Sequence, residues 1–248
     1  MRIVLAVLCL LAGLGSAAAA DLKLLTAGAY KPVALELVPE FEKRTGHKVT
    51  VENATAGVLQ KRIAGGEYFD VVVLPPLVLG PFLGGRVVES SAKSLARVGI
   101  GVAVKQGTPL PDISSVDAFK KTLLTARAVA YIDPAAGGSS GVYLAGLFEK
   151  LGIAQQLKAK SVLVPGGLVA ERVVSGQADI ALHQISEILA VPGAVLVGPI
   201  PLKVQHYTEY SGGVSVGSRN RTAADALLLE FADPKNLPVL KKKGMDGP

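Results

Sequence analysis

Short apolar runs alternate with amphipathic segments along most of this chain, and turns rich in small residues join them. Residues 22–26 are apolar or β-branched except for Lys23, and the turn Ala27-Gly28-Ala29 leads to Pro32, a residue favoured in the first turn of a helix. The same order recurs, with further strands expected at residues 48–52, 71–74, 97–104, 127–132, 160–164, 179–183 and 207–216. Alternating strands and helices predict a doubly wound α/β architecture, with parallel sheets covered by helices on both faces.

A turn-rich segment, residues 106–111, interrupts this alternation and marks a passage into a second lobe. Further along, Pro199 and Pro201 follow a short apolar run and indicate a return crossing. We therefore predict that residues 21–105 form the first part of lobe 1 and that residues 106–203 form lobe 2. Residues 204–248 then return to lobe 1 with a strand and the C-terminal helices.

Residues 1–20 have the features of a secretory signal peptide. Arg2 gives the positive start, residues 3–14 are an apolar run, and Ala18-x-Ala20 is a small-residue cleavage signature. The apolar run is shorter than the ~20 residues that a membrane-spanning helix needs. We predict cleavage after Ala20 and export of the mature chain to the periplasm.

Cysteine occurs once, at Cys9 inside this signal, and residues 6–8 lack the small residue expected before a lipidated cysteine. The mature chain therefore has no thiol, which excludes disulfides, cysteine nucleophiles, iron–sulfur clusters and cysteine zinc sites. Loss of Arg2 lowers the formal net charge from +6 to +5. The mature protein is thus modestly basic and attracts anions weakly.

Four predicted strand-to-helix turns consist of small residues, at 27–29, 54–57, 137–141 and 165–167. A helix N-terminus presents unpaired N–H donors and a partial positive charge, and small side chains let an anion reach them. Further donors are the hydroxyls of Thr26, Thr55, Ser139 and Ser140. Together the turns predict a site for a desolvated oxyanion that needs no paired Lys or Arg. Packing alone also favours glycine in such turns, and this alternative stays open.

A second pattern overlaps the third turn, because Gly137-x-Ser139-x-Gly141 matches the nucleophile elbow of serine hydrolases. Asp179 and either His183 or His206 follow in a permissible order. An elbow serine stands directly after its strand, however, whereas residues 133–138 intervene here. The spacing therefore disfavours a hydrolase.

Other site classes find little support in the residues. His47, His183 and His206 lack metal-ligand spacing and no carboxylate-rich calcium loop occurs, so we predict no metal and no cofactor. A basic stripe with interleaved aromatic residues is missing and export argues against nucleic acid. Tyr30 and Tyr210 are candidate hydroxyl donors at a cleft, although such tyrosines are more often packing residues.

Several stretches carry a resemblance to a known family: Leu25-Thr-Ala-Gly-Ala-Tyr30, Phe41-Glu-Lys-Arg-Thr-Gly46, Thr55-Ala-Gly-Val-Leu-Gln-Lys-Arg-Ile63, Asp70-Val-Val-Val and Ser175-Gly-Gln-Ala-Asp179. In order and spacing the chain resembles the periplasmic molybdate-binding-like solute receptors of ABC importers. The resemblance implies the type II periplasmic binding protein fold, two α/β lobes joined by two crossings that close on a ligand. It also implies a monomer that captures a small anion of the molybdate or tungstate type for an ABC permease in the inner membrane.

The sequence departs from this family at the implied site. Ala29 and Ala56 align where the family has serines, while neighbouring threonines offer compensating hydroxyls. Gln184 falls where the family has a tyrosine hydroxyl. The chain is therefore a divergent member whose anion is molybdate, tungstate, sulfate or an organic acid. The expected ligand-binding residues are Thr26, Gly28, Ala29, Thr55, Ala56, Gly57, Ser139, Ser140, Gly167 and Gln184.

The resemblance also extends to a periplasmic isomerase of aconitate type on the same scaffold, which keeps an enzyme open as the alternative. Moving a proton beside a carboxylate needs a general base in the cleft. His183, Glu187 and Tyr30 are the candidates for that base. The transport receptor is the first hypothesis, and it assigns no catalytic residue.

Overall fold

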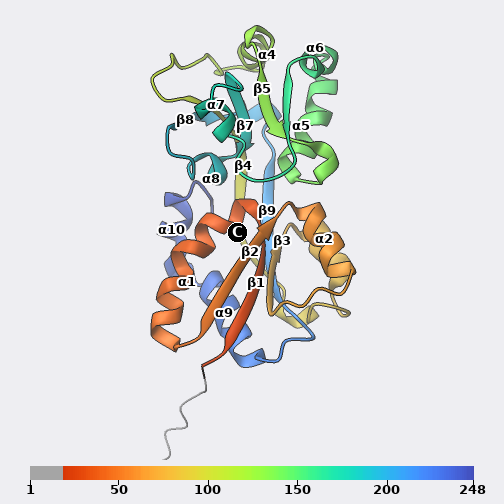
Figure 1. Ribbon diagram of the computed structural model, residues 1–248, viewed down its shortest axis with the longest axis vertical. Coiled ribbons are helices and arrows are strands. Elements are labelled where there is room, and N and C mark those ends of the chain that lie inside the picture. The colour runs from red at the N-terminus through yellow and green to blue at the C-terminus, as the bar shows by residue number, and fades with distance from the viewer. Residues whose placement is uncertain (1–18) are drawn as a thin grey trace, which may run out of the picture.

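Two neighbouring strands connect the halves of the molecule in the computed structural model, which describes residues 19–248 (Figure 1). These strands are β4 (Lys93–Lys105) and β9 (Tyr207–Val214), and they pair antiparallel. We call the half that contains both ends of the described chain lobe 1 and the other half lobe 2. Gln205 links the two crossings, because its side chain donates to and accepts from the backbone of Ile100 at 2.9 Å.

The sheet of lobe 1 is mainly parallel and has the strand order β2-β1-β3-β9-β4. Strand β1 (Asp21–Ala27) pairs in parallel with both β2 (Lys48–Ala54) and β3 (Val71–Leu74), and β9 enters antiparallel between β3 and β4. The helices of lobe 1 are α1 (Lys31–Thr45), α2 (Ala56–Ala64), α3 (Pro76–Leu79), α9 (Arg221–Ala232) and α10 (Leu237–Lys242).

Lobe 2 has a sheet with the strand order β8-β4-β7-β5-β6. Strand β5 (Val129–Ile132) pairs in parallel with β6 (Ser161–Val164) and β7 (Ile180–Gln184), while β4 pairs antiparallel with β7 and β8 (Ala194–Pro199). Its helices are α4 (Val116–Thr125), α5 (Ser139–Lys150), α6 (Ala154–Lys158), α7 (Glu171–Val174) and α8 (Ile185–Ile188). The predicted α/β architecture is confirmed. Strands β4 and β9 pair antiparallel because β4 leaves lobe 1 and β9 returns to it.

Each lobe has its own hydrophobic core. In lobe 1, Phe41 of α1 and Phe231 of α9 belong to the cluster built on β1 and β3. In lobe 2, two clusters surround β5 and β7. Along β4 the core changes between Val98 and Ile100, so this strand serves both lobes. The lobe boundaries after residues 105 and 203 stay predictions.

Helix α1 begins and ends as its sequence indicates. A turn of 3₁₀ helix, Gly28–Tyr30, precedes it, Pro32 lies in its first turn, and Gly46 ends it with φ of 77°, a left-handed conformation that glycine adopts without strain. The predicted signal peptide falls on residues 1–20, of which 1–18 lie outside the described residues. Within residues 19–248 no helix is both long and apolar enough to cross a bilayer.

Candidate functional site

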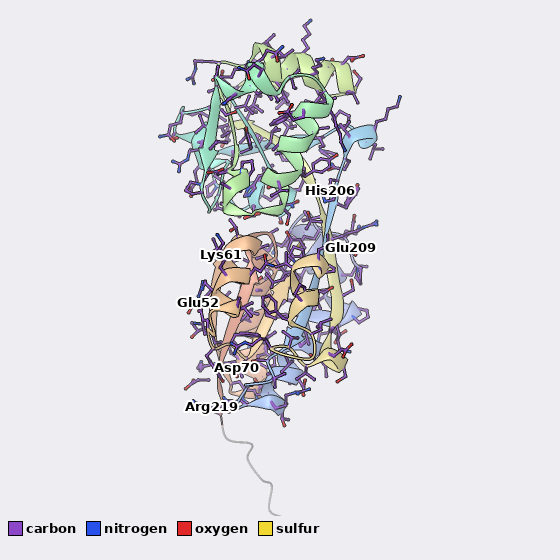
Figure 2. All side chains as sticks on the ribbon, turned by 90° about the vertical axis from the view of Figure 1, so that its right-hand side faces the viewer. Glu52, Lys61, Asp70, His206, Glu209 and Arg219 are labelled. Atoms are coloured by element: carbon purple, nitrogen blue, oxygen red, sulfur yellow. The ribbon has the colours of Figure 1, made fainter. Side chains whose placement is uncertain are left out.

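A cavity lies between the lobes, where β1, β2, β5 and β7 end and the next helices begin. Its volume is about 40 Å³, which is roughly the space of three water molecules. Figure 2 shows the two lobes from the side, with Lys61 near the end of lobe 1 that faces lobe 2. The lining residues are Ala27, Gly28, Ala29, Asn53, Ala54, Thr55, Ala56, Ile132, Gly138, Ser139, Ser140, Gly167, His183, Gln184, Glu187 and Tyr210. We call this space the inner cavity.

The lobes touch each other directly beside the inner cavity. Thr55 caps α2 by accepting from the Val58 N–H at 3.3 Å, and its hydroxyl donates to the Ala136 carbonyl of lobe 2 at 2.5 Å. The Gly57 N–H donates to the Gly137 carbonyl at 3.1 Å. A Cβ at Gly57 would lie 2.9 Å from the Gly137 Cα, so this approach requires glycine. The structure therefore has the closed arrangement of the lobes.

Helix N-termini of both lobes face this cavity. Ala56 is the first residue of α2, and Ser139 and Ser140 are the first residues of α5. The first N–H groups of a helix have no partner within the helix, and they carry a partial positive charge. Because no Lys or Arg belongs to the described lining, backbone and hydroxyl donors are the groups that can hold an anion here.

An acid and base pair forms part of the cavity wall. His183 is the next-to-last residue of β7, and Glu187 lies four residues later, in α8. The Nε2 of His183 is 3.2 Å from the Oε2 of Glu187. Both residues are buried. The other oxygen of Glu187, Oε1, lies over the backbone of Gly28 in lobe 1, where a Cβ would be only 2.4 Å away. Gly28 therefore lets Glu187 reach the junction of the lobes.

Burial sets the protonation of this pair. It raises the pKa of Glu187 to about 8, an effect that the positive charge of Lys31 opposes. Burial also lowers the pKa of His183 to about 3. The pKa of Tyr210 is raised, mainly by burial and further by the charge of Glu187. At neutral pH the imidazole is thus uncharged and Glu187 titrates in the range that proton transfer in water requires.

Two buried polar atoms of this region have no hydrogen-bond partner among the described residues. They are the Nδ1 of His183 and the Oε1 of Gln184. The amide nitrogen of Gln184 donates to the Thr208 hydroxyl at 2.9 Å, which fixes the orientation of its amide group. Buried polar atoms are nearly always paired in folded proteins, so these two atoms are available to a bound water molecule or a ligand.

Most of the residues expected at the site line this cavity. They are Gly28, Ala29, Thr55, Ala56, Ser139, Ser140, Gly167 and Gln184. Thr26 does not, because it is buried in the strand and its hydroxyl donates to the Ala27 carbonyl. Gly57 does not, because it packs against Gly137. Contact of any of these residues with a ligand stays a prediction.

Of the three candidate bases, the cavity includes two. Tyr30 lies in the core of lobe 1, edge to face with Phe231 at 5.7 Å between ring centroids, and is absent from the lining. Sequence reasoning missed Asn53 and Ile132. Both lie at or next to the carboxyl end of a strand, which is where ligands bind in such sheets. This position in the sequence could have indicated them as site residues.

The hydrolase arrangement is not assembled in the described chain. Asp179 lies at the opposite end of β7 from His183, and its carboxylate pairs with Arg127 at 3.0 Å. His206 stacks on Tyr143 at 4.5 Å between ring centroids, on the segment that joins the lobes (Figure 2). No hydrogen bond joins Ser139 to a histidine among residues 19–248.

A second, larger cavity adjoins the first. It has a volume of about 420 Å³ and shares Gly28, Asn53, Gly167 and Glu187 with the inner cavity. Its other lining residues are Lys31, Pro32, Leu35, Glu36, Leu168, Ala190 and Lys243. We call it the outer cavity. Glu187 therefore stands between a small polar space and a wider one that carries positive charge.

Two α/β lobes joined by two crossings, with an anion-compatible cavity between them, define the class of periplasmic binding proteins. The chain belongs to the bacterial extracellular solute-binding protein family, which it matches over residues 22–246. It is also 36% identical over 231 residues to a Pseudomonas protein named aconitate isomerase, a match that covers 90% of this chain and 87% of that protein.

Solved structures of low sequence identity share the fold. The periplasmic molybdate-binding protein of Azotobacter vinelandii has a TM-score of 0.79 at 19% identity, with 92% of this chain and 99% of that chain covered. A tungstate-binding protein of Desulfovibrio alaskensis has a TM-score of 0.63 at 14% identity, with 93% and 99% covered. The expected molybdate-binding-like, type II periplasmic binding protein fold is confirmed.

Proposed function

We propose that this protein is an isomerase that binds aconitate between its lobes and moves a proton along its carbon chain. The buried pair of His183 and Glu187 in the cavity wall carries this proposal. A carboxyl group whose pKa is about 8 can take up and release a proton in the cavity wall near neutral pH. The identity of 36% to a protein named aconitate isomerase supports the same substrate.

Isomerisation of aconitate moves one proton and one double bond and leaves the atomic composition unchanged. Aconitate has one methylene group beside its carbon–carbon double bond, and each of these carbons bears a carboxylate. Ionised Glu187 removes a methylene proton, and the electron pair of that C–H bond is delocalised over the allylic carbons. Return of a proton from Glu187 to the other terminal carbon forms a new C–H bond and shifts the double bond. Because either geometry can form at the new double bond, the cis and trans isomers interconvert.

The described residues assign the other roles. Uncharged His183, 3.2 Å from Glu187, holds the carboxyl group in place. The N-termini of α2 and α5, with Ser139 and Ser140, hold a carboxylate of the substrate and stabilise the charge that develops on it. Gly28 and Gln184 complete the contacts that we assign to the inner cavity.

Proton nuclear magnetic resonance in D₂O tests this proposal directly. Purified mature protein with cis-aconitate is expected to form trans-aconitate and to introduce deuterium at the carbon that receives the proton. No added metal or cofactor is needed. The matched control is Glu149→Gln, which changes an exposed glutamate in the last turn of α5. If the protein binds aconitate but forms neither the second isomer nor deuterated product, the isomerase proposal is wrong.

A second candidate function is a receptor for an ABC importer, and the helix N-termini at the inner cavity favour it. A desolvated oxyanion fits a wall that holds N–H and hydroxyl donors and no Lys or Arg. In either case we propose an exported monomer, cleaved after Ala20 and located in the periplasm.

Thermal unfolding against a panel of anions separates the two functions. A ligand at 100 times its Kd adds about 2.7 kcal/mol of stability. Stabilisation by molybdate or tungstate, together with no turnover of aconitate, supports the receptor. Stabilisation by aconitate alone supports the isomerase.

A further inference from the structure

The two cavities differ in size, and so they can hold different parts of one ligand. The inner cavity, at about 40 Å³, has room for one carboxylate or one tetrahedral oxyanion, since it holds roughly three water molecules. A carbon chain with several carboxylates is larger. Because the two cavities share four lining residues, the remainder of such a ligand extends past Glu187 into the outer cavity.

Two lysines line the outer cavity, and only one of them is available. Lys243 is paired with Glu36 at 2.9 Å, and the neighbouring Lys242 is paired with the other oxygen of Glu36 at 2.7 Å. Lys31, the first residue of α1, forms no ion pair within residues 19–248 and is only partly exposed. A partly buried cation without a carboxylate partner, in the wall of a cavity, is suited to an anionic ligand.

We propose that Lys31 is a specificity residue that pairs with a carboxylate in the outer cavity, so that the site selects polycarboxylates over inorganic oxyanions. This inference rests on the proposed function, and it adds the residue that recognises the part of the substrate remote from the reacting carbon. Asn53 lines both cavities and offers a neutral amide to the same ligand.

The position of Lys31 also connects recognition to proton transfer. Its charge is close enough to Glu187 to lower the pKa of that carboxyl group. A ligand carboxylate paired with Lys31 offsets this charge, so Glu187 becomes a stronger base when a polycarboxylate is bound. The groups that face Glu187 are His183 from β7, Lys31 from α1 and Tyr210 from β9.

The test uses the mature protein with two unreactive probes, propane-1,2,3-tricarboxylate and molybdate, in calorimetric titrations. The variants are Lys31→Met, Lys31→Arg and, as a matched control, Lys158→Met, which changes an exposed lysine at the end of α6 in lobe 2. Loss of a charged hydrogen bond is expected to weaken tricarboxylate binding about 10- to 100-fold in Lys31→Met. Molybdate binding and the melting temperature stay unchanged, and Lys31→Arg recovers part of the affinity.

Kinetics with cis-aconitate provide the second measurement. Lys31→Met is expected to raise KM more than it lowers kcat, and added salt is expected to weaken wild-type binding more than binding by this variant. Wild-type tricarboxylate affinity in Lys31→Met, or no tricarboxylate binding by the wild type, overturns the inference. Lys31-dependent binding without any turnover overturns the isomerase proposal and leaves the inference standing. Turnover of aconitate that is the same in Lys31→Met as in the wild type overturns the inference and leaves the isomerase proposal standing.

Discussion

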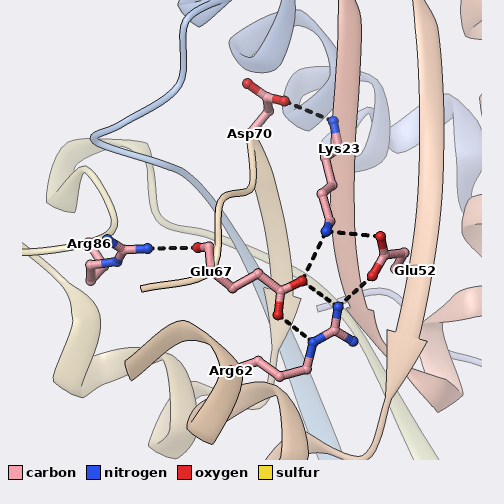
Figure 3. Close-up of polar contacts among 6 residues, drawn as sticks. All are labelled: Lys23, Glu52, Arg62, Glu67, Asp70 and Arg86. Atoms are coloured by element: carbon pink, nitrogen blue, oxygen red, sulfur yellow. Dashed lines mark hydrogen bonds and ion pairs between the residues drawn. The ribbon is translucent and has the colours of Figure 1, made fainter. Parts of the chain in front are cut away.

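Charged side chains meet in two very different ways in this molecule. At the surface of lobe 1, Lys23, Glu52, Arg62 and Glu67 form a cluster of four ion pairs, with both Lys23 contacts at 2.9 Å (Figure 3). We call it the surface ion cluster. In the cavity wall, His183 and Glu187 form one buried pair.

The pKa values of the carboxyl groups move in opposite directions in these two regions. Hydrogen bonds from Arg62, and then from Lys23, lower the pKa of Glu67 to about 2, so it stays ionised. Burial raises the pKa of Glu187 to about 8, although the charge of Lys31 opposes this shift. Paired charges near water serve the structure, whereas a buried carboxyl group that titrates near neutrality is suited to move protons.

The largest expected effect follows from removal of the carboxylate base. Glu187→Gln keeps the size of the side chain and is expected to lower kcat for aconitate about 100- to 10,000-fold. An isomerisation assay checks this, with Glu67→Gln in the surface ion cluster expected to keep wild-type kcat. Equal losses in both variants would contradict the distinction between the two regions.

The same assay has a pH dependence that identifies the base. With Glu187 as the base, kcat/KM rises about tenfold per pH unit below its pKa of about 8 and levels off above it. His183, whose pKa is lowered to about 3, would instead give a flat profile over this range.

The next effect tests the space that Glu187 needs. In Gly28→Ala the new Cβ would lie 2.4 Å from the Oε1 of Glu187, so the carboxyl group must rotate away. We expect kcat to fall about tenfold or more, because displacement of a catalytic group by about 1 Å is costly. Stability stays close to that of the wild type, since the displaced atoms are the end of a flexible side chain. Gly146→Ala, where a Cβ meets nothing within 4 Å, is the control and keeps full activity.

A smaller effect is expected from the contact between the lobes. Gly57→Ala would place a Cβ 2.9 Å from the Gly137 Cα and separate the lobes at this point. A ligand that we propose to bind between the lobes must then offset the cost of closing them, so we expect affinity for aconitate to fall several-fold, with kcat less affected. Small-angle scattering with saturating ligand measures the closure. A radius of gyration identical to that of the liganded wild type would show that the lobes close without this contact.

The last effects are on stability, and they change with pH in opposite directions. The raised pKa of Glu187 gives stability that is complete below pH ~4.5 and is lost as pH rises through about 8. The lowered pKa of Glu67 gives stability that is complete above pH ~4.5 and is lost as pH falls towards about 2.

Urea unfolding between pH 3 and 8 is expected to separate these contributions. Relative to Glu187→Gln, the wild type loses stability above pH 5, at most about 1.4 kcal/mol per pH unit. Relative to Glu67→Gln, it loses at most about 1 kcal/mol, and it does so below pH 5. If both differences change in the same direction with pH, the opposed pKa shifts are wrong.

Local sequence signals predicted much of the fold and part of the candidate site. Pro32, Gly46 and the small-residue turns act within a few positions of themselves, so β1, α1 and the cavity edge at Gly28 and Ser139 follow from them. Contacts between distant segments left no such signal. The bond from Thr55 to Ala136 spans 81 positions, and it uses a hydroxyl that the sequence assigned to a ligand.

The candidate base illustrates the same limit. The sequence indicated Glu187 as a candidate base, whereas its burial, its raised pKa and the approach of its Oε1 to Gly28 of the other lobe are visible only in the fold. Burial depends on the whole fold, whereas the spacing of His183 and Glu187 is visible in the chain. The sequence therefore indicated the pair as candidates but did not show its protonation.

The placement of β9 has a consequence for how the chain acquires its structure during synthesis. Lobe 2 is made from one continuous stretch, and its strands are complete once β8 has emerged. Lobe 1 starts the chain, yet β9 is an interior strand of its sheet, between β3 and β4, and its last helices follow β9. The half of the molecule that is made first is therefore the half that is finished last, and until residue 214 is available the β3 edge of that sheet has no neighbour.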